Sequence, residues 1–221
     1  AWLDATHLGT HRLEEEFPTV LRGARTYGFD LATQRVPVTP AAHYMVGGVR
    51  TDLHGRTSLT GLYAAGEVAS TGAHGANRMA GNSLSEALVF GRRAAHAMTR
   101  ELPEPDGEVG PQPTLAREVP PADQLELLRA ELRQTMWAGI GPVRDAPGIT
   151  GALERLAGLT EQLGPATTDR IQAELRLAAV SARLIGESAL LRTETRGGHV
   201  REDHPDADPA WADVHLERIA P

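Results

Sequence analysis

Cysteine is absent from the 221-residue sequence, which excludes disulfide bonds, thiolate nucleophiles and thiolate metal sites. No apolar run approaches the roughly 20 residues that a helix needs to span a bilayer, and the N-terminus shows no signal-peptide pattern. The formal net charge is −7 and no basic face is evident, so a phosphate backbone is not the expected partner. We therefore expect a cytoplasmic protein that binds neither nucleic acid nor a membrane and holds no metal.

Aromatic residues are also scarce, at 4%, whereas 41% of the residues are hydrophobic. This composition supports an ordinary packed core and favours close-packed helices of small residues over a β-sandwich. At this length the chain can form one good-sized domain or two small ones.

The first half of the sequence contains a helical pattern followed by a glycine-rich stretch. Apolar residues recur at intervals of three and four from His11 to Ala24, which predicts one amphipathic helix. Pro37 and Pro40 then mark a domain crossing. In the glycine-rich stretch we expect a hairpin turn, a short buried strand and a helix, at Asp52–Gly55, Leu62–Ala65 and Asn82–Ala97. The last of these carries Leu84, Ala87, Leu88 and Gly91 on one side.

The second half is helical. Residues 101–121 are rich in proline and acidic residues, which predicts an extended linker. Three apolar stripes follow, and with short connections they predict a three-helix bundle. The stripes are Leu125, Leu128, Leu132 and Met136; Ile149, Leu153, Leu156 and Leu163; and Ile171, Leu175, Ala178, Ala182, Ile185 and Ala189. We expect the polar tail from Asp203 to lie on the surface.

The residues that carry chemistry lie between Pro40 and Gly91. Glu67 follows a predicted strand, at the sheet edge where ligands of open α/β sheets bind. The helix that begins at Asn82 offers unpaired backbone N–H groups and the positive end of a dipole. Arg78 has a planar fork that suits a carboxylate, and His43 can donate a second hydrogen bond. A lone arginine is usually a solvated surface residue and a lone histidine is more often structural, but these lie in one glycine-dense block.

Four motifs in this order resemble a known family. They are His-Tyr-x-x-Gly-Gly at residues 43–48, Gly-Leu-Tyr-Ala-Ala-Gly-Glu at 61–67, His-Gly-Ala-Asn-Arg at 74–78, and Thr-Glu-Thr-Arg-Gly-Gly-His at 193–199. Together they resemble the succinate dehydrogenase, fumarate reductase and L-aspartate oxidase superfamily of flavoproteins. The family's usual Ala-Ser-Asn-Ser-Leu-Leu-Glu is replaced by a sequence with Gly81 and Ser85, and neither change removes a backbone contact to flavin. For residues 196–199 we favour a structural role over contact with the active site.

The resemblance implies a role for each matching residue. Glu67, Ser83 and Leu84 would contact non-covalent FAD, while His43 and Arg78 would hold the carboxylates of a four-carbon diacid. The implied reaction is oxidation of L-aspartate to iminoaspartate on the quinolinate route to NAD, with oxygen or fumarate reoxidising the flavin. The family's acid/base arginine would lie upstream of Ala1, so we expect no catalytic residue in this chain.

The resemblance also implies an α+β fragment, the C-terminal part of an FAD-binding α/β domain followed by a three-helix bundle. No G-x-G-x-x-G fingerprint occurs, so we expect the N-terminal half to be a missing partner and the chain alone to be inactive. The expected divisions are a capping-domain tail, part of the FAD-binding domain, a linker and a helical domain, at residues 1–38, 39–100, 101–121 and 122–221.

Three functions remain open. The short segment from Arg50 to Thr60 favours the aspartate oxidase branch, because succinate dehydrogenases carry a longer insert there. The alternatives are a fragment of a succinate dehydrogenase or fumarate reductase flavoprotein, and a non-catalytic helical interaction module.

Overall fold

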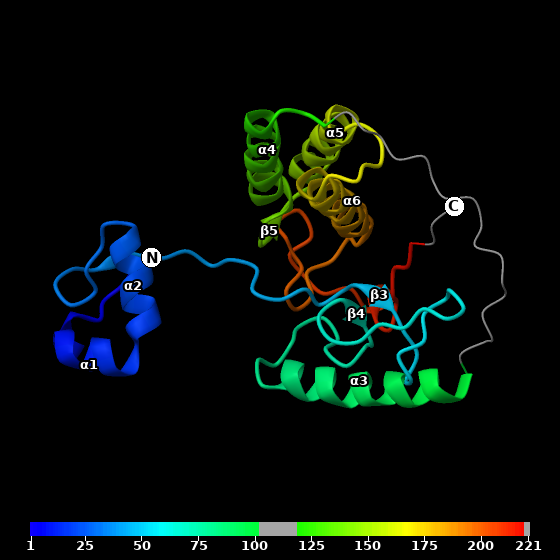
Figure 1. The fold of residues 1–221 in the computed structure, drawn as a ribbon, viewed down its shortest axis with the longest axis horizontal. Coiled ribbons are helices and arrows are strands. Elements are labelled where there is room, and N and C mark those ends of the chain that lie inside the picture. Colours follow the sequence, from blue (N-terminus) through cyan, green and yellow to red (C-terminus); the bar gives the residue numbers. More distant parts are fainter. Residues whose placement is uncertain (102–118, 219–221) are drawn as a thin grey trace. The chain divides into compact units, whose positions relative to one another are not determined.

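A computed structural model describes residues 1–101 and 119–218. The chain forms two compact units, Ala1–Ala41 and Ala42–Pro221 (Figure 1). The linker predicted at 101–121 lies, except at its ends, outside the described residues. The assignment of the units to capping, FAD-binding and helical domains stays a prediction.

The first unit is a small helical hairpin tied by two short strands. Its elements are β1 (Trp2–Leu3), a 3-10 turn (Thr6–Leu8), α1 (Gly9–Glu16), α2 (Pro18–Thr26) and β2 (Val36–Pro37), with β1 antiparallel to β2. Ala5, Leu13, Leu21 and Leu31 form its buried core. The prediction of one helix from His11 to Ala24 is wrong. Phe17 leaves the helical region at φ −132° and ψ 43°, because a residue before proline is disfavoured in the α conformation.

The second unit begins with a loop-rich segment on a long helix. Its elements are β3 (Val49–Arg50), β4 (Ala69–Ser70) and α3 (Asn82–Glu101), with β3 parallel to β4. The turn predicted at Asp52–Gly55 is present, with a bond from the Gly55 N–H to the Asp52 carbonyl and a φ of +75° at Gly55. It does not join the two strands of a hairpin, because β3 pairs in parallel with β4 instead. The predicted strand at Leu62–Ala65 is wrong, since the structure has only an isolated bridge between Arg56 and Tyr63 there.

Helix α3 is confirmed, but it does not bury the side that carries Leu84 and Leu88. Those side chains are 79% and 75% exposed. The buried residues of α3 are Glu86, Phe90, Ala94 and Ala97. The helix therefore presents an apolar face to solvent and turns a carboxylate inward.

The predicted three-helix bundle is confirmed by α4 (Ala122–Ile140), α5 (Ala146–Gln162) and α6 (Arg170–Leu191). Its core is formed by leucines and alanines from all three helices, and Leu156 at its centre is fully buried. Asp145 and Asp169 cap the starts of α5 and α6 by accepting backbone N–H bonds, which satisfies donors that a helix start leaves unpaired. The stripe predicted on α6 is partly wrong, because Ile171 and Ala178 are exposed and the residues that follow them, Gln172 and Ala179, are buried instead.

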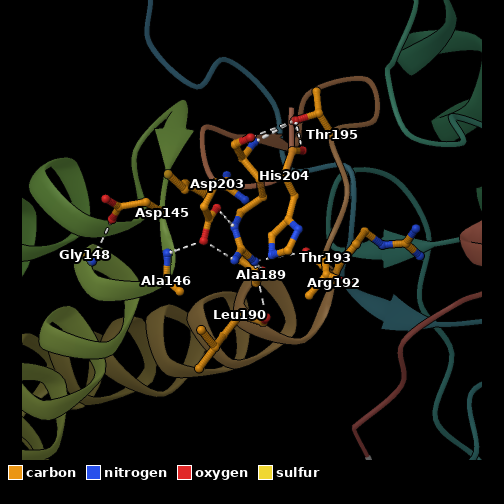
Figure 2. Close-up of polar contacts among 12 residues, drawn as sticks. Asp145, Ala146, Gly148, Ala189, Leu190, Arg192, Thr193, Thr195, Asp203 and His204 are labelled. Atoms are coloured by element: carbon orange, nitrogen blue, oxygen red, sulfur yellow. Dashed lines mark hydrogen bonds and ion pairs between the residues drawn. The ribbon is translucent and has the colours of Figure 1, made fainter. Parts of the chain in front are cut away.

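Beyond α6 the chain returns to the bundle and pairs β6 (Val200–Arg201) in parallel with β5 (Val143–Arg144). Arg201 is 1% exposed and donates to both carboxylate oxygens of Asp203, at 2.7 and 2.8 Å. The Asp203 carboxylate also accepts the N–H of Ala146, the first residue of α5 (Figure 2). The described helices include none with the length and apolar character to cross a bilayer.

Candidate functional site

The guanidinium of Arg78 is held at the junction of two of the sequence motifs. Its Cζ lies 4.3 Å from the centre of the Tyr44 ring, a distance typical of a cation–π contact. Its Nη1 donates to the Ser83 hydroxyl at 2.7 Å and to the Ala80 carbonyl at 2.8 Å. The arginine is thereby fixed beside the first turn of α3.

A buried acid and a buried histidine support this arrangement from behind. His74 Nε2 lies 2.7 Å from Glu86 Oε2, and the two side chains are 6% and 4% exposed. The other oxygen of Glu86 accepts from the Thr71 hydroxyl. The ring of Tyr44 meets the ring of His74 edge to face at 5.5 Å. Tyr44 is therefore packed between His74 and Arg78.

The electrostatics of Tyr44 follow from these neighbours. Burial, and then the nearby negative charges of Glu86 and Glu67, raise the pKa of the Tyr44 phenol, while the positive charge of Arg78 opposes them. The phenol accordingly stays neutral at physiological pH, and its uncharged ring lies against the arginine.

Glu67 connects two of the motifs. Its Oε1 accepts the backbone N–H of Met45 at 3.0 Å. Nearby, the N–H of Val49 bonds to the Val68 carbonyl at 2.8 Å. A Cβ at Gly48 would lie 2.3 Å from that same carbonyl oxygen, and Gly48 has a φ of +147°. The second glycine of the His-Tyr-x-x-Gly-Gly motif is thus required by the close approach of β3 to β4.

The predicted site residues come from adjoining segments. Arg78 and Ser83 are bonded directly, and Arg78 packs on Tyr44, which follows His43 in the chain. Glu67, Leu84 and His43 are exposed. Within the described residues no hydrogen bond joins His43 to Arg78, so their joint grip on a ligand stays a prediction.

The sequence alone did not indicate that Tyr44 and Glu86 support this site. A signal was present for Glu86, because it lies four residues before Phe90 and eight before Ala94 on the buried face of α3. A carboxylate on a buried helical face requires a partner. No comparable pattern identifies Tyr44, whose role depends on contacts with residues about 30 positions away in the chain.

The residues present fit a flavin in two respects. The first-turn amides of the 20-residue helix α3 face no earlier turn of their own helix, which suits an electron-rich ring or anion. The side chain of Leu84 beside them is 79% exposed, and the Glu67 carboxylate is also exposed. Both are therefore available to a cofactor.

Comparison with known proteins defines the class. Residues 1–84 match the FAD binding domain family, and residues 129–218 match the fumarate reductase flavoprotein C-terminal family. The chain belongs to the flavoprotein family that comprises L-aspartate oxidases, succinate dehydrogenases and fumarate reductases, and it corresponds to a C-terminal portion of those proteins.

Three individual relatives show how similar the chain is to members of this family. The chain is 42% identical to the L-aspartate oxidase of Streptomyces coelicolor over 100% of its own length and 40% of that protein. It is 44% identical to the L-aspartate oxidase of Rhodospirillum rubrum, over 95% of the chain and 73% of that protein. It is also 37% identical to a fumarate reductase (CoM/CoB) protein of Methanothermobacter marburgensis, over 95% of the chain and 41% of that protein. The chain thus spans about 40% of the length of two of these three relatives.

Solved structures give the same class. A quinol–fumarate reductase with menaquinol molecules superposes with a TM-score of 0.78 at 30% identity, over 94% of this chain and 40% of that one. The Mycobacterium smegmatis Sdh1 in complex with UQ1 superposes with a TM-score of 0.73 at 31% identity, over 96% of this chain and 39% of that one.

Proposed function

We propose that this chain supplies substrate-binding and flavin-binding residues of an FAD-dependent L-aspartate oxidase, which converts L-aspartate to iminoaspartate. One observation carries the proposal. Nη1 of Arg78 is occupied by Ser83 and Ala80, whereas its Nε is buried and has no hydrogen-bond partner among the described residues. Nη2 also has no hydrogen-bond partner among the described residues, since both bonds of the guanidinium come from Nη1. Nε and Nη2 are therefore the donors of the guanidinium that the protein leaves for a ligand, and their planar spacing suits a carboxylate held through two parallel bonds.

The chain's residues would divide the work of binding. Arg78 would hold one carboxylate, and His43, which precedes in the chain the Tyr44 on which Arg78 packs, would donate to a carboxylate oxygen. Tyr44 and Ser83 hold the guanidinium in place, so little side-chain entropy is lost when substrate binds. When bound, FAD would accept the hydride from the substrate α-carbon. Glu67, Ser83 and Leu84 would contact that cofactor.

The identity to the two L-aspartate oxidases, 42% and 44%, exceeds the 37% to the Methanothermobacter marburgensis fumarate reductase protein and the 30–31% to the fumarate reductase and Sdh1 structures. This difference supports the oxidase over the succinate and fumarate branch. The interaction-module alternative has less support, because the buried stripes of α4, α5 and α6 pack against one another and so form the bundle's own core.

The test joins this chain to the part of the Streptomyces coelicolor relative that it does not cover, and assays L-aspartate and succinate with oxygen and with fumarate. We expect oxidation of L-aspartate in preference to succinate. Arg78→Lys keeps the charge but loses the fork, and should raise KM for aspartate by about 10²-fold, the loss of roughly 2–3 kcal/mol typical of a charged hydrogen bond. Arg100→Lys on exposed α3 is the matched control. A preference for succinate would place the protein in the other branch.

A further inference from the structure

The motif at residues 193–199 ends in a tight hairpin whose position has a functional consequence. Arg196 and His199 exchange two backbone hydrogen bonds, from the Arg196 N–H at 2.8 Å and the His199 N–H at 3.0 Å. Gly197 and Gly198 form the two-residue loop between them, and Gly197 has a φ of +59°. A positive φ at the first loop residue is characteristic of a type II′ turn, which selects glycine there.

The tip of this hairpin touches the loop that carries Arg78. The Gly198 N–H donates to the Ala76 carbonyl at 2.9 Å. A Cβ built on Gly197 would lie 2.3 Å from the same oxygen and 2.6 Å from its carbon. Ordinary contact begins at 3.4 Å, so no side chain fits at Gly197 unless the backbone of one segment moves by about 1 Å. The corresponding Cβ at Gly198 would be 3.8 Å away.

The hairpin itself is firmly anchored. Arg196 donates through Nε and Nη2 to both oxygens of Glu194, at 2.7 and 2.8 Å. Glu194 is fully buried and also accepts from Arg192 and from the Asp208 N–H. These contacts, with Arg196 the largest, lower the pKa of the Glu194 carboxyl to about 2. The loop before Arg78 is held by longer backbone hydrogen bonds, from Gly75 to Gly72 and from Asn77 to His74, each 3.3 Å. We therefore expect this loop, and not the hairpin with its charged bonds, to move when the two collide.

We propose that Gly197 is a positioning residue for substrate binding: it lets the hairpin clamp the Ala76 carbonyl and so sets where Arg78, two residues later, presents its free edge. The inference rests on the proposed function. Arg78 already has Nη1 fixed by Ser83 and Ala80. A shift of the preceding backbone therefore changes the direction of the remaining edge, while the guanidinium stays in the protein.

The experiment compares three alanine variants of the fusion protein described above. Gly197→Ala introduces both the collision and a disfavoured φ. Gly198→Ala keeps the N–H and adds a Cβ in ordinary contact. Gly164→Ala, remote in the α5–α6 connection, has a φ of +66°, and its Cβ would meet only Gln172 Nε2, at an ordinary contact distance of 4.0 Å. The last variant reproduces the backbone strain without the collision. The measurements are KM and kcat per bound flavin, and hydrogen–deuterium exchange of residues 72–81.

A 1 Å misplacement of a binding group costs up to about 10²-fold, so we expect Gly197→Ala to raise KM for L-aspartate at least tenfold. Its flavin content should be retained and exchange in residues 72–81 should be faster. Gly198→Ala and Gly164→Ala should stay within about twofold of the parent. An unchanged KM in Gly197→Ala, or a loss of flavin and kcat at unchanged KM, would overturn the proposal. If the parent does not oxidise aspartate, the proposed function fails, and the exchange data alone then decide whether Gly197 governs the loop.

Discussion

The strongest stability prediction concerns Arg201, which connects the end of α6 to the start of α5. Besides the two bonds to Asp203, its Nη1 donates to the carbonyls of Ala189, Leu190 and Arg192, at 2.8, 3.3 and 3.0 Å. These carbonyls belong to the last turn of α6 and the residue after it, where a helix leaves acceptors without intrahelical partners. Arg201→Met retains a chain of similar length and removes every donor.

The expected loss of stability follows from the groups that Arg201→Met would leave without a donor. Breaking a buried charge pair by removing one partner costs about 3–5 kcal/mol, and an unsatisfied buried carbonyl costs about 1–3 kcal/mol. Water can reach part of the Asp203 side chain, which is 29% exposed, so part of this penalty is recovered. We therefore expect Arg201→Met to lower the free energy of unfolding by about 4 kcal/mol.

Urea denaturation followed by far-ultraviolet circular dichroism measures this change, because α4, α5 and α6 dominate the signal. With a slope of about 2 kcal/mol per molar urea, the midpoint should fall by about 2 M. Arg133→Met, at an exposed position of α4, should change the midpoint little. The urea midpoint of Arg201→Lys should lie between those of the two methionine variants, since lysine keeps the charge but not the fork. Equal midpoints for Arg201→Met and Arg133→Met would show that the bonds of Arg201 do not stabilise the bundle.

Other contacts give predictions of their own. A Cβ at Gly139 would lie 2.4 Å from the Gly148 carbonyl oxygen, so Gly139→Ala should lower the free energy of unfolding by about 1–3 kcal/mol and lower Tm. Gly151→Ala has open space around its Cβ and should raise Tm, because alanine favours the helix. His199 accepts from Arg144 at Nδ1 and donates to the Arg192 carbonyl; burial first, and then the nearby arginine charges, lower its pKa. NMR titration should therefore show a neutral Nε2–H tautomer with a pKa below 6.5. Because the pKa of the Glu194 carboxyl falls from 4.5 to about 2 on folding, its stabilisation is complete above 4.5 and is lost as the pH falls toward 2. Glu194→Gln should be less stable at neutral pH, and its stability should fall less steeply than the parent's as the pH is lowered from 4.5 toward 2. An equally steep fall in the two proteins would contradict a lowered pKa of Glu194.

Much of the helical structure could be predicted because it depends on local periodicity. The stripes of α4 and α5 place Leu128 and Leu156 in the core, as the structure does. The prediction failed for the single helix through residue 17, where the proline at 18 overrides an unbroken apolar pattern.

The prediction of which face of α3 is buried failed for a different reason. Leu84 and Leu88 outrank Glu86 in hydrophobicity, yet the structure buries Glu86 because His74 and Thr71 satisfy its two oxygens. Those partners lie 12 and 15 positions away, so no helical period reveals them. The candidate site shows the same limit. The motifs identified Arg78 and Ser83, but the ring that supports the guanidinium comes from a separate motif.

Two arginines in this chain differ in how fully the protein uses their hydrogen-bond donors. In Arg201 all three guanidinium nitrogens donate to protein acceptors, so its role in helix connection is complete without a ligand. In Arg78 Nη1 is used twice, while Nε is buried and has no partner within the described part of the chain. A buried donor without an acceptor costs free energy, and a bound carboxylate would remove that cost. The uneven use of its donors, rather than the presence of an arginine in a motif, is the physical support for the proposal that Arg78 binds the substrate.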